Sequence, residues 1–327
     1  MAIKIVLLGQ ANVGKTSIGR FLRHLNRMLA LETEPSTRIE RYNISVLCRD
    51  IFIFVTPGQR RYKKLNINFL SDIIDENTIV FYVIDAAAEV ERLKSMVIEF
   101  VMTIRYLKKI IEIKNIERLY VVLLAHKQDM PNAIKSESII GKIKSNKKLL
   151  EKIKLEGYNT SIYHPETIFS VVDNVILSKI LPMNDIYKIV ETLRKMTGSK
   201  VSVISDNVGF PIAFSGDGNL TTWLSVFSAK VHASIDQERE IVKNFQKKMW
   251  EEFFKDSNGS SFELILEISA GKILYMAAQK MGKEVLYISL LNPTTNPIIL
   301  RDVVKGVFQR LFFILDERAQ GYAIDMV

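Results

Sequence analysis

The sequence predicts an α/β domain with a doubly wound, mostly parallel sheet over residues 1–181, followed by an α+β domain with a five-stranded antiparallel sheet over residues 183–327. The first part alternates short, almost continuous apolar runs with helical patterns, which is typical of a parallel sheet covered on both faces. After Pro182, short strands follow one another with only tight turns between them, which indicates antiparallel pairing. A chain of 327 residues is long enough for two domains with separate cores.

In the first domain, strands and helices are expected in regular alternation. Residues 3–8 (IKIVLL) are short and β-branched, so they are expected to form a buried strand. The stretch SIGRFLRHLNRML (17–29) has apolar residues at helical spacing. The other elements expected here are a strand pair over about 40–55, a strand at 78–85, a helix near 89–111 and a strand at 118–127.

In the second domain, the expected order is helix, hairpin, helix, meander and helix. A helix over about 184–197, closed by Gly198, leads into two strands within VSVISDNVGFPIAFSG (201–216). A helical stretch over about 219–255, with a break near Ser234, comes next. Three strands at 261–269, 272–279 and 284–290 and an amphipathic helix in NPIILRDVVKGVFQRLFFIL (296–315) complete the domain.

The composition favours a globular protein of a reducing compartment. Apolar residues make up 48% and charged residues 25% of the chain, which argues against wholesale disorder. The single cysteine, Cys48, excludes an internal disulfide framework. No run of eighteen apolar residues is present, and the start MAIKIVLLGQ has too short an apolar run for a signal peptide. We therefore expect a cytoplasmic protein, with peripheral contact to the cytoplasmic face of a membrane as a secondary expectation.

The segment GQANVGKTS (9–17) carries the strongest chemical signal. It satisfies the pattern G-x-x-x-x-G-K-[ST], and it lies between a predicted strand and a predicted helix, where this loop works. Gly9 and Gly14 let the backbone curl so that its N–H groups surround phosphates, helped by the helix N-terminus. Lys15 would reach the β- and γ-phosphates, and Thr16 would bind Mg²⁺.

A second motif, HKQD (126–129), ends a predicted apolar strand and points to guanine. Asp129 can accept two hydrogen bonds from guanine N1 and N2, whereas adenine offers no matching pair of donors and would leave the carboxylate unpaired, at a cost of several kcal/mol. Lys127 would lie over the base. In NTSIYH (159–164), Ser161 and Ile162 would present backbone N–H groups to the guanine carbonyl. The alternative is a polar strand end that Asp129 merely caps.

Together these motifs resemble a Ras-superfamily G domain, and specifically the Rag/Gtr branch, which uses His-Lys-x-Asp and Thr-Ser-Ile at these two places. The resemblance implies GTP or GDP and Mg²⁺ as ligands, with guanine contacts that include His126. It makes Thr37, in LETEPSTRIERYNISV (31–46), the residue that senses the γ-phosphate and the metal, and Gln59 the residue that orients the attacking water. The implied phosphate-binding residues are Gly9, Asn12, Val13, Gly14, Lys15, Thr16, Ser17 and Gly58, and the implied metal ligands are Thr16 and Thr37.

One position departs from this family. In IFIFVTPGQRRY (51–62), Val55 stands where the D-x-P-G-Q motif has an aspartate that holds a magnesium-bound water. Two interpretations stay open: Thr16, Thr37 and the phosphates hold the metal and hydrolysis is slow, or turnover is negligible and the protein is a nucleotide-stabilised scaffold. Asp85, at the end of the next core strand, could compensate through a water, although a strand-end aspartate more often caps its own loop.

The resemblance extends to partners. Rag proteins carry a C-terminal roadblock-type domain, and the element order of residues 183–327 matches it; a longin-like module, which has a different helix order, is the alternative. This implies a homodimer or a heterodimer with a related GTPase, with roadblock or longin-type proteins as further partners. The net charge of +9 and the lysine-rich stretch 141–154 could suit an anionic membrane, but an exposed helix edge is the alternative, and no nucleic-acid partner is expected.

Overall fold

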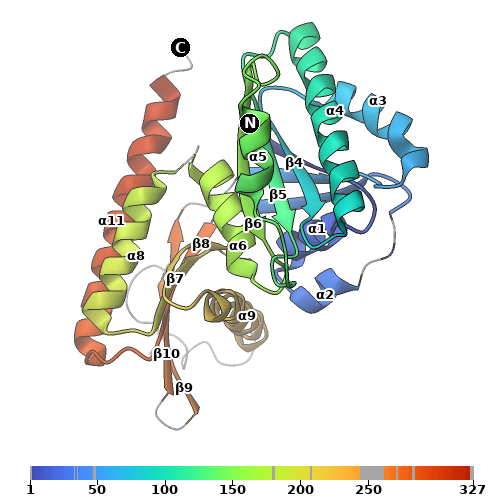
Figure 1. Ribbon diagram of the computed structural model, residues 1–327. Coiled ribbons are helices and arrows are strands. Elements are labelled where there is room, and N and C mark those ends of the chain that lie inside the picture. Colours follow the sequence, from blue (N-terminus) through green and yellow to red (C-terminus); the bar gives the residue numbers. More distant parts are fainter. Residues whose placement is uncertain are drawn as a thin grey trace. The chain divides into compact units, whose positions relative to one another are not determined.

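The structure is a computed structural model that describes residues 2–32, 34, 36–46, 49–178, 181–206, 208–243, 261–269, 272–281 and 284–324. The chain divides into two compact units, Met1–Ile168 and Phe169–Val327. The division falls inside helix α6 (Pro165–Val172), upstream of the boundary near Pro182 that the sequence suggested. Each unit has a sheet of its own (Figure 1).

The first unit contains a six-stranded sheet in the order β2-β3-β1-β4-β5-β6. All neighbouring pairs are parallel except β2–β3, which is antiparallel, so the predicted mostly parallel sheet is confirmed. Every residue of β4 is buried, as expected for a central strand covered on both faces. The strands are β1 (Ile3–Leu8), β2 (Glu40–Val46), β3 (Arg49–Val55), β4 (Thr78–Asp85), β5 (Leu119–His126) and β6 (Ile153–Thr160).

The helices of this unit differ from the prediction in two places. The single helix expected over 17–29 is two helices, because Leu25 adopts a left-handed conformation (φ 49°) and the Asn26 side chain then caps the second helix by accepting the N–H of Met28. In the lysine-rich stretch, helix ends already at Lys144. The helical elements are α1 (Lys15–His24), α2 (Arg27–Leu31), the 3₁₀ turn η1 (Arg60–Tyr62), α3 (Lys63–Ile73), α4 (Val90–Lys114) and α5 (Ser136–Lys144).

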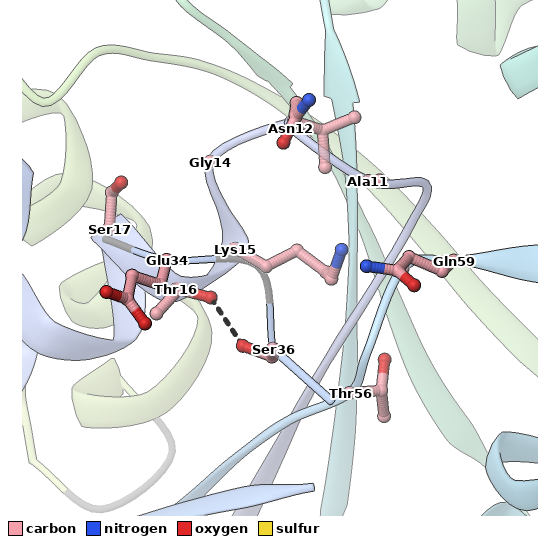
Figure 2. A pocket seen from close by; sticks show the side chains of 12 residues that line it. Ala11, Asn12, Gly14, Lys15, Thr16, Ser17, Glu34, Ser36, Thr56 and Gln59 are labelled. Atoms are coloured by element: carbon pink, nitrogen blue, oxygen red, sulfur yellow. Dashed lines mark hydrogen bonds between the residues drawn. The ribbon is translucent and has the colours of Figure 1, made fainter. Parts of the chain in front are cut away.

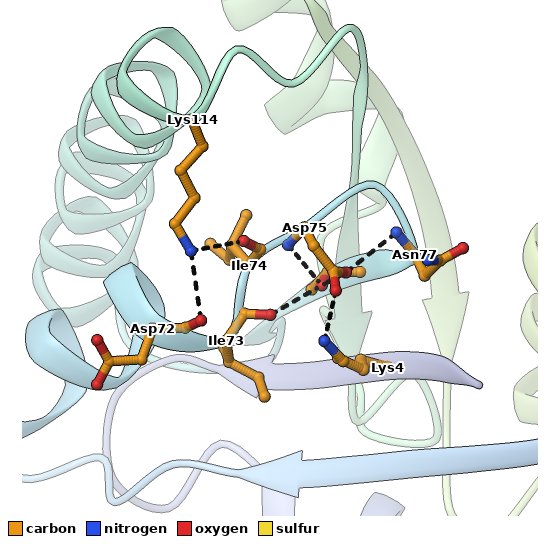
Figure 3. Close-up of polar contacts among 8 residues, drawn as sticks. Lys4, Asp72, Ile73, Ile74, Asp75, Asn77 and Lys114 are labelled. Atoms are coloured by element: carbon orange, nitrogen blue, oxygen red, sulfur yellow. Dashed lines mark hydrogen bonds and ion pairs between the residues drawn. The ribbon is translucent and has the colours of Figure 1, made fainter. Parts of the chain in front are cut away.

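A polar network fixes the amino-terminal ends of β1 and β4 (Figure 3). The Asp75 carboxylate accepts hydrogen bonds from Lys4 Nζ at 2.5 Å and from the Thr78 hydroxyl at 2.8 Å. Lys114, at the end of α4, donates to the carbonyl groups of Asp72 and Ile74. This network therefore anchors the edge of the sheet at which β1 and β4 begin. The parallel strands β1, β4 and β5 end at the opposite edge.

The second unit contains an antiparallel sheet in the order β8-β7-β11-β10-β9. The predicted hairpin and meander are both present. The sheet packs against α9 through a core that includes Val203, Leu224, Met276 and Tyr287. Its strands are β7 (Val201–Ser205), β8 (Pro211–Ser215), β9 (Ser261–Ser269), β10 (Lys272–Met281) and β11 (Glu284–Leu291).

The helices of the second unit cover both sides of this sheet, with α9 on one side and the neighbouring α8 and α11 on the other (Figure 1). Gly198 closes α8 in a left-handed conformation, as predicted. The break expected near Ser234 is wrong, because α9 runs through this residue; the rest of that predicted stretch, 244–260, lies outside the described residues. The helices are the π-helical η2 (Asp173–Leu177), α8 (Met183–Thr197), α9 (Gly218–Lys243) and α11 (Pro297–Ile324). Within the described ranges, none of the helices has both the length and the apolar character needed to cross a membrane.

Candidate functional site

The loop between β1 and α1 has the backbone that its two glycines predict. Gly9 and Gly14 lie in the left-handed region, with φ 135° and 97°. A Cβ at Gly9 would lie 2.3 Å from the Val83 carbonyl oxygen, and one at Gly14 would lie 2.5 Å from Cδ2 of His126. Asn12 also has a positive φ of 62°. The loop thus curls tightly at the carboxyl edge of the sheet, with its backbone packed against two neighbouring strands.

A pocket lies over this loop (Figure 2). It is formed by the loop, by the first turn of α1, by Glu34 and Ser36, and by the segment that follows β3. Gln59 lies on its wall, and its side chain points toward that of Lys15. Thr37 is exposed beside the pocket, and Ser36 lines it instead. The lining residues are Ala11, Asn12, Val13, Gly14, Lys15, Thr16, Ser17, Glu34, Ser36, Thr56, Gly58 and Gln59.

Lys15 is held inside the loop. Its Nζ donates hydrogen bonds to the carbonyl groups of Gly9 at 2.9 Å and Gln10 at 2.7 Å. Burial lowers the pKa of Lys15 to about 8, and the nearby Glu99 carboxylate acts in the opposite direction. An anion in the pocket would favour the charged lysine and raise its pKa again. Lys15 is therefore placed to respond to a bound phosphate.

Gly58 brings the segment after β3 into contact with the phosphate loop. A Cβ at this position would lie 2.4 Å from the carbonyl carbon of Gln10 and 2.5 Å from the amide nitrogen of Ala11. These neighbours are backbone atoms, which cannot rotate away as a side chain could. Only glycine permits this approach, and the approach places Gln59 at the pocket.

His126 joins the second motif to the phosphate loop. It is 2% exposed at the end of β5, and its Nδ1 lies 3.0 Å from the Thr160 hydroxyl. Burial lowers the pKa of His126 to about 4, with a smaller contribution from the Lys127 charge, and Asp129 and Asp85 act in the opposite direction. The imidazole is thus neutral near pH 7, and it fills the space that a side chain at Gly14 would occupy.

Lys127 ties together three segments. Its Nζ lies 2.7 Å from a carboxylate oxygen of Asp85 and donates to the Asn12 carbonyl at 3.0 Å. The other Asp85 oxygen accepts the N–H of Ala87 at 3.2 Å. The Asp85 carboxylate is therefore committed to Lys127 and to its own loop, which supports the capping interpretation over a role near magnesium.

Asp129, Ser161 and Ile162 lie together beyond the ends of β5 and β6. The Ser161 hydroxyl donates to the Asp129 carboxylate, and Ser161 Oγ accepts the N–H of Tyr163 at 3.0 Å. Ile162 is buried, whereas Asp129 is exposed. Asp129 thus presents its carboxylate to solvent in an orientation that Ser161 holds, as a receptor for a pair of donors requires.

The donor set near Thr16 fits a magnesium ion that is bound together with phosphates. The described residues contain no group of three His, Cys, Asp or Glu side chains that could hold a metal alone. Mg²⁺ needs few protein ligands when phosphates and waters supply the other oxygens. The Thr16 hydroxyl lines the pocket, 3.1 Å from the Ser36 hydroxyl. Val55 is fully buried, and its side chain packs toward Gly19 in α1.

Four residues of this pocket are not among the predicted site residues, and one of them, Ala11, lies inside the predicted phosphate loop. Thr56 lies two residues before the predicted Gly58, so its place in the sequence was a usable signal that it lines the pocket. Its hydroxyl donates to the Leu7 carbonyl at 2.9 Å. Glu34 and Ser36 belong to a segment without a fixed motif. Only the fold shows that this segment passes the first turn of α1.

A family model described as the ADP-ribosylation factor family matches residues 1–178, which is more than half of the chain. Comparison with curated proteins gives no significant match. Among solved structures, the chain is similar to the Arl6 BBS3 small GTPase from Trypanosoma brucei with bound GppNp, at 16% identity over 50% of this chain and 88% of that chain, with a TM-score of 0.40.

Two further solved structures are similar over about half of the chain. The mammalian SRP receptor is 15% identical over 49% of this chain and 92% of that chain, with a TM-score of 0.39. The SRb-GTP/SRX complex of the signal recognition particle receptor from Chaetomium thermophilum is 15% identical over 50% and 91%, with a TM-score of 0.38. Since all three TM-scores are below 0.5, the assignment depends on the family match.

Proposed function

The chain belongs to the ADP-ribosylation factor family of small GTPases, and from this premise we propose that it is a molecular switch that binds GTP and hydrolyses it to GDP. One observation supports the proposal: the phosphate loop and the HKQD motif (126–129) are in direct contact. His126 packs against Gly14, and Lys127 donates to the Asn12 carbonyl. A ligand with a base at one end and phosphates at the other would span both motifs.

Guanine recognition is assigned to Asp129. Its carboxylate accepts the N1–H and N2–H donors of guanine, while the hydrogen bond from Ser161 keeps it in place. Lys127 lies over the base with its ammonium group fixed by Asp85. Adenine would leave this carboxylate without its donors, which gives the preference for GTP over ATP.

Hydrolysis is assigned to Gln59, which orients a water toward the γ-phosphate from the wall of the pocket. Contact between Gly58 and the phosphate loop sets its position. Lys15 and the loop N–H groups stabilise the negative charge that develops on the phosphate oxygens. When bound, Mg²⁺ neutralises part of the same charge, with Thr16 as its protein ligand.

A scaffold with negligible turnover is the second candidate. Two observations favour it: Val55 supplies no carboxylate, and Thr37 is exposed beside the pocket. A scaffold would bind guanine nucleotide tightly and leave it uncleaved. Single-turnover GTP hydrolysis, measured with and without Mg²⁺, distinguishes the switch from the scaffold. The nucleotide already bound to the purified protein must be identified first.

The Rag/Gtr branch and a roadblock-like second domain complete the proposal. The motifs His126-Lys127 and Thr160-Ser161-Ile162 support the branch, and the observed element order of the second unit supports the roadblock-like domain. We assign dimerisation to this unit, as a homodimer or with a related GTPase. The exposed Phe313 and Ile298 on α11 and the edge strands β8 and β9 offer surface for it. Nucleotide state would then toggle partner binding, in the cytoplasm or at the cytoplasmic face of a membrane.

Two measurements test the proposal. Competition binding should show a strong preference for GTP and GDP over ATP, and equal affinities would overturn the guanine assignment. Sedimentation of the full chain at concentrations of tens of micromolar should show a dimer. At such concentrations a complex with a Kd near 1 µM is about fully formed. A monodisperse monomer with every nucleotide would contradict self-association and leave only the heterodimer.

A further inference from the structure

The carboxylate that is missing at position 55 has a counterpart on the neighbouring strand. In the antiparallel β2–β3 pair, Glu40 lies directly opposite Val55. Side chains that are directly opposite in such a pair point to the same face of the sheet. Tyr42, two residues along β2, lies on that face too, since a Cβ at Gly19 of α1 would meet both Tyr42 and Val55 at 2.8 Å. Glu40 is therefore on the face that α1 covers.

We propose that Glu40 replaces the missing aspartate: acting through Ser36, it positions the Thr16 hydroxyl as the magnesium ligand of the phosphate pocket. The inference rests on the proposed GTP-binding function, because the magnesium ion arrives with the nucleotide. Glu40 is in this scheme a positioning residue, since Ser36 lies between it and Thr16.

The direction of the hydrogen bonds carries the argument. The Ser36 hydroxyl has one proton, and it donates that proton to the Glu40 carboxylate, which can only accept. In the contact of 3.1 Å between Thr16 Oγ1 and Ser36 Oγ, Thr16 must therefore be the donor. With its proton turned toward Ser36, the Thr16 oxygen keeps its lone pairs for a cation in the pocket. Hydrogen bonds that orient a ligand in this way are a general feature of metal sites.

Glu40 is itself held in place. Its second carboxylate oxygen accepts the hydroxyl of Tyr42, which is 7% exposed. The guanidinium of Arg23 lies over the Tyr42 ring, 5.6 Å from its centre. Both oxygens of Glu40 thus have a donor, and the tyrosine that provides one of them is fixed by packing. Asp85, which the sequence offered as a substitute for the missing carboxylate, is engaged by Lys127.

The test is the magnesium dependence of GDP release, measured with a fluorescent GDP analogue over a range of free Mg²⁺. Glu40→Gln keeps the shape of the side chain and removes its charge, so the Mg²⁺ concentration for half-maximal retention should rise about tenfold, the lower end of the range for loss of an orienting partner. Ser36→Ala should shift it in the same direction. Release in excess EDTA should match the wild type, because a merely structural defect would also alter release without metal.

The matched control is Glu112→Gln on the exposed part of α4, which should titrate like the wild type. A Glu40→Gln variant that also titrates like the wild type would overturn the inference while leaving GTP binding intact. A wild type that binds no guanine nucleotide would instead overturn the proposed function.

A second variant asks whether the two carboxylate positions are equivalent. Val55→Asp should restore tight magnesium dependence in the Glu40→Gln background and change little in the wild type. Such non-additivity is expected only of residues that serve one contact. If Val55→Asp changed the magnesium dependence equally in the wild type and in the Glu40→Gln background, the inference would be overturned. Melting curves must show that the variants are folded.

Discussion

Substitution of Gly58 by alanine tests how closely the segment after β3 must approach the phosphate loop. The added Cβ would lie 2.4 Å from the Gln10 carbonyl carbon, whereas ordinary contact begins at 3.4 Å, so the segment must retreat by about 1.0 Å (3.4 − 2.4). Gln59 is the next residue and must move with it. A misplacement of about 1 Å in an enzyme site can cost about 100-fold in rate, or about 2.7 kcal/mol of barrier.

We therefore expect Gly58→Ala to hydrolyse GTP about 100-fold more slowly in a single turnover, with GDP affinity and melting temperature little changed. Gly58 does not have a left-handed φ, so alanine introduces no backbone strain. The matched control is Gly141→Ala in α5, where a Cβ has nothing within 4 Å. It should leave hydrolysis unchanged and stabilise the helix by about 0.5–1 kcal/mol. A folded Gly58→Ala protein with wild-type turnover would refute the reasoning.

Three further predictions concern the base site and two buried titratable groups. Asp129→Asn should shift the nucleotide preference toward xanthine nucleotides, because the amide replaces a hydrogen-bond acceptor by a donor. Competition binding among GTP, XTP and ATP measures this shift, and an unchanged preference for GTP would contradict the prediction. Burial lowers the pKa of His126 to about 4 in the folded protein, whereas an exposed histidine in the unfolded chain has a pKa of 6.5. Because the unfolded chain then binds the proton first, stability should fall as pH drops from about 6.5 to 4, by about 3 kcal/mol (2.5 × 1.36). Circular dichroism melts should show this slope, and His126→Asn should flatten it. Burial raises the pKa of Asp173 to about 7, with the Tyr187 hydrogen bond acting in the opposite direction, so stability is lost as pH rises from about 4 to 7. Asp173→Asn should then stabilise the second unit at pH 8 by up to about 4 kcal/mol ((7 − 3.8) × 1.36). Tryptophan fluorescence reports the unfolding of this unit, because both tryptophans lie in residues 169–327. An unchanged midpoint of unfolding would count against the prediction.

The parts of the site with short, contiguous motifs were predictable from the sequence. The phosphate loop needs glycine at two left-handed positions, and both stand at fixed spacing before Lys15. The motif that ends in Asp129 follows a fully apolar strand, so its place at the carboxyl edge followed from the strand pattern. Local chemistry and fold agreed there, and the prediction needed no knowledge of distant contacts.

The parts that depend on strand register were not predictable. Glu40 acquires a role because β2 pairs with β3 in a register that sets it opposite Val55, and no local pattern encodes that register. The contact of Ser36, rather than Thr37, with Thr16 joins residues 20 positions apart, and no local pattern encodes it. The break between α1 and α2 depends on Asn26, whose capping role is a weak signal inside a continuous helical pattern.

The bonds of Lys127 have a further consequence for small ligands. Because this lysine bonds to both the Asn12 carbonyl and Asp85, the protein's own contacts join the proposed base subsite to the phosphate loop. A fragment as small as guanosine would therefore lose little free energy to loop ordering, and rigid preorganised pockets favour high affinity per atom. Inhibitor design against this protein should start from the base end of the site and grow toward the loop.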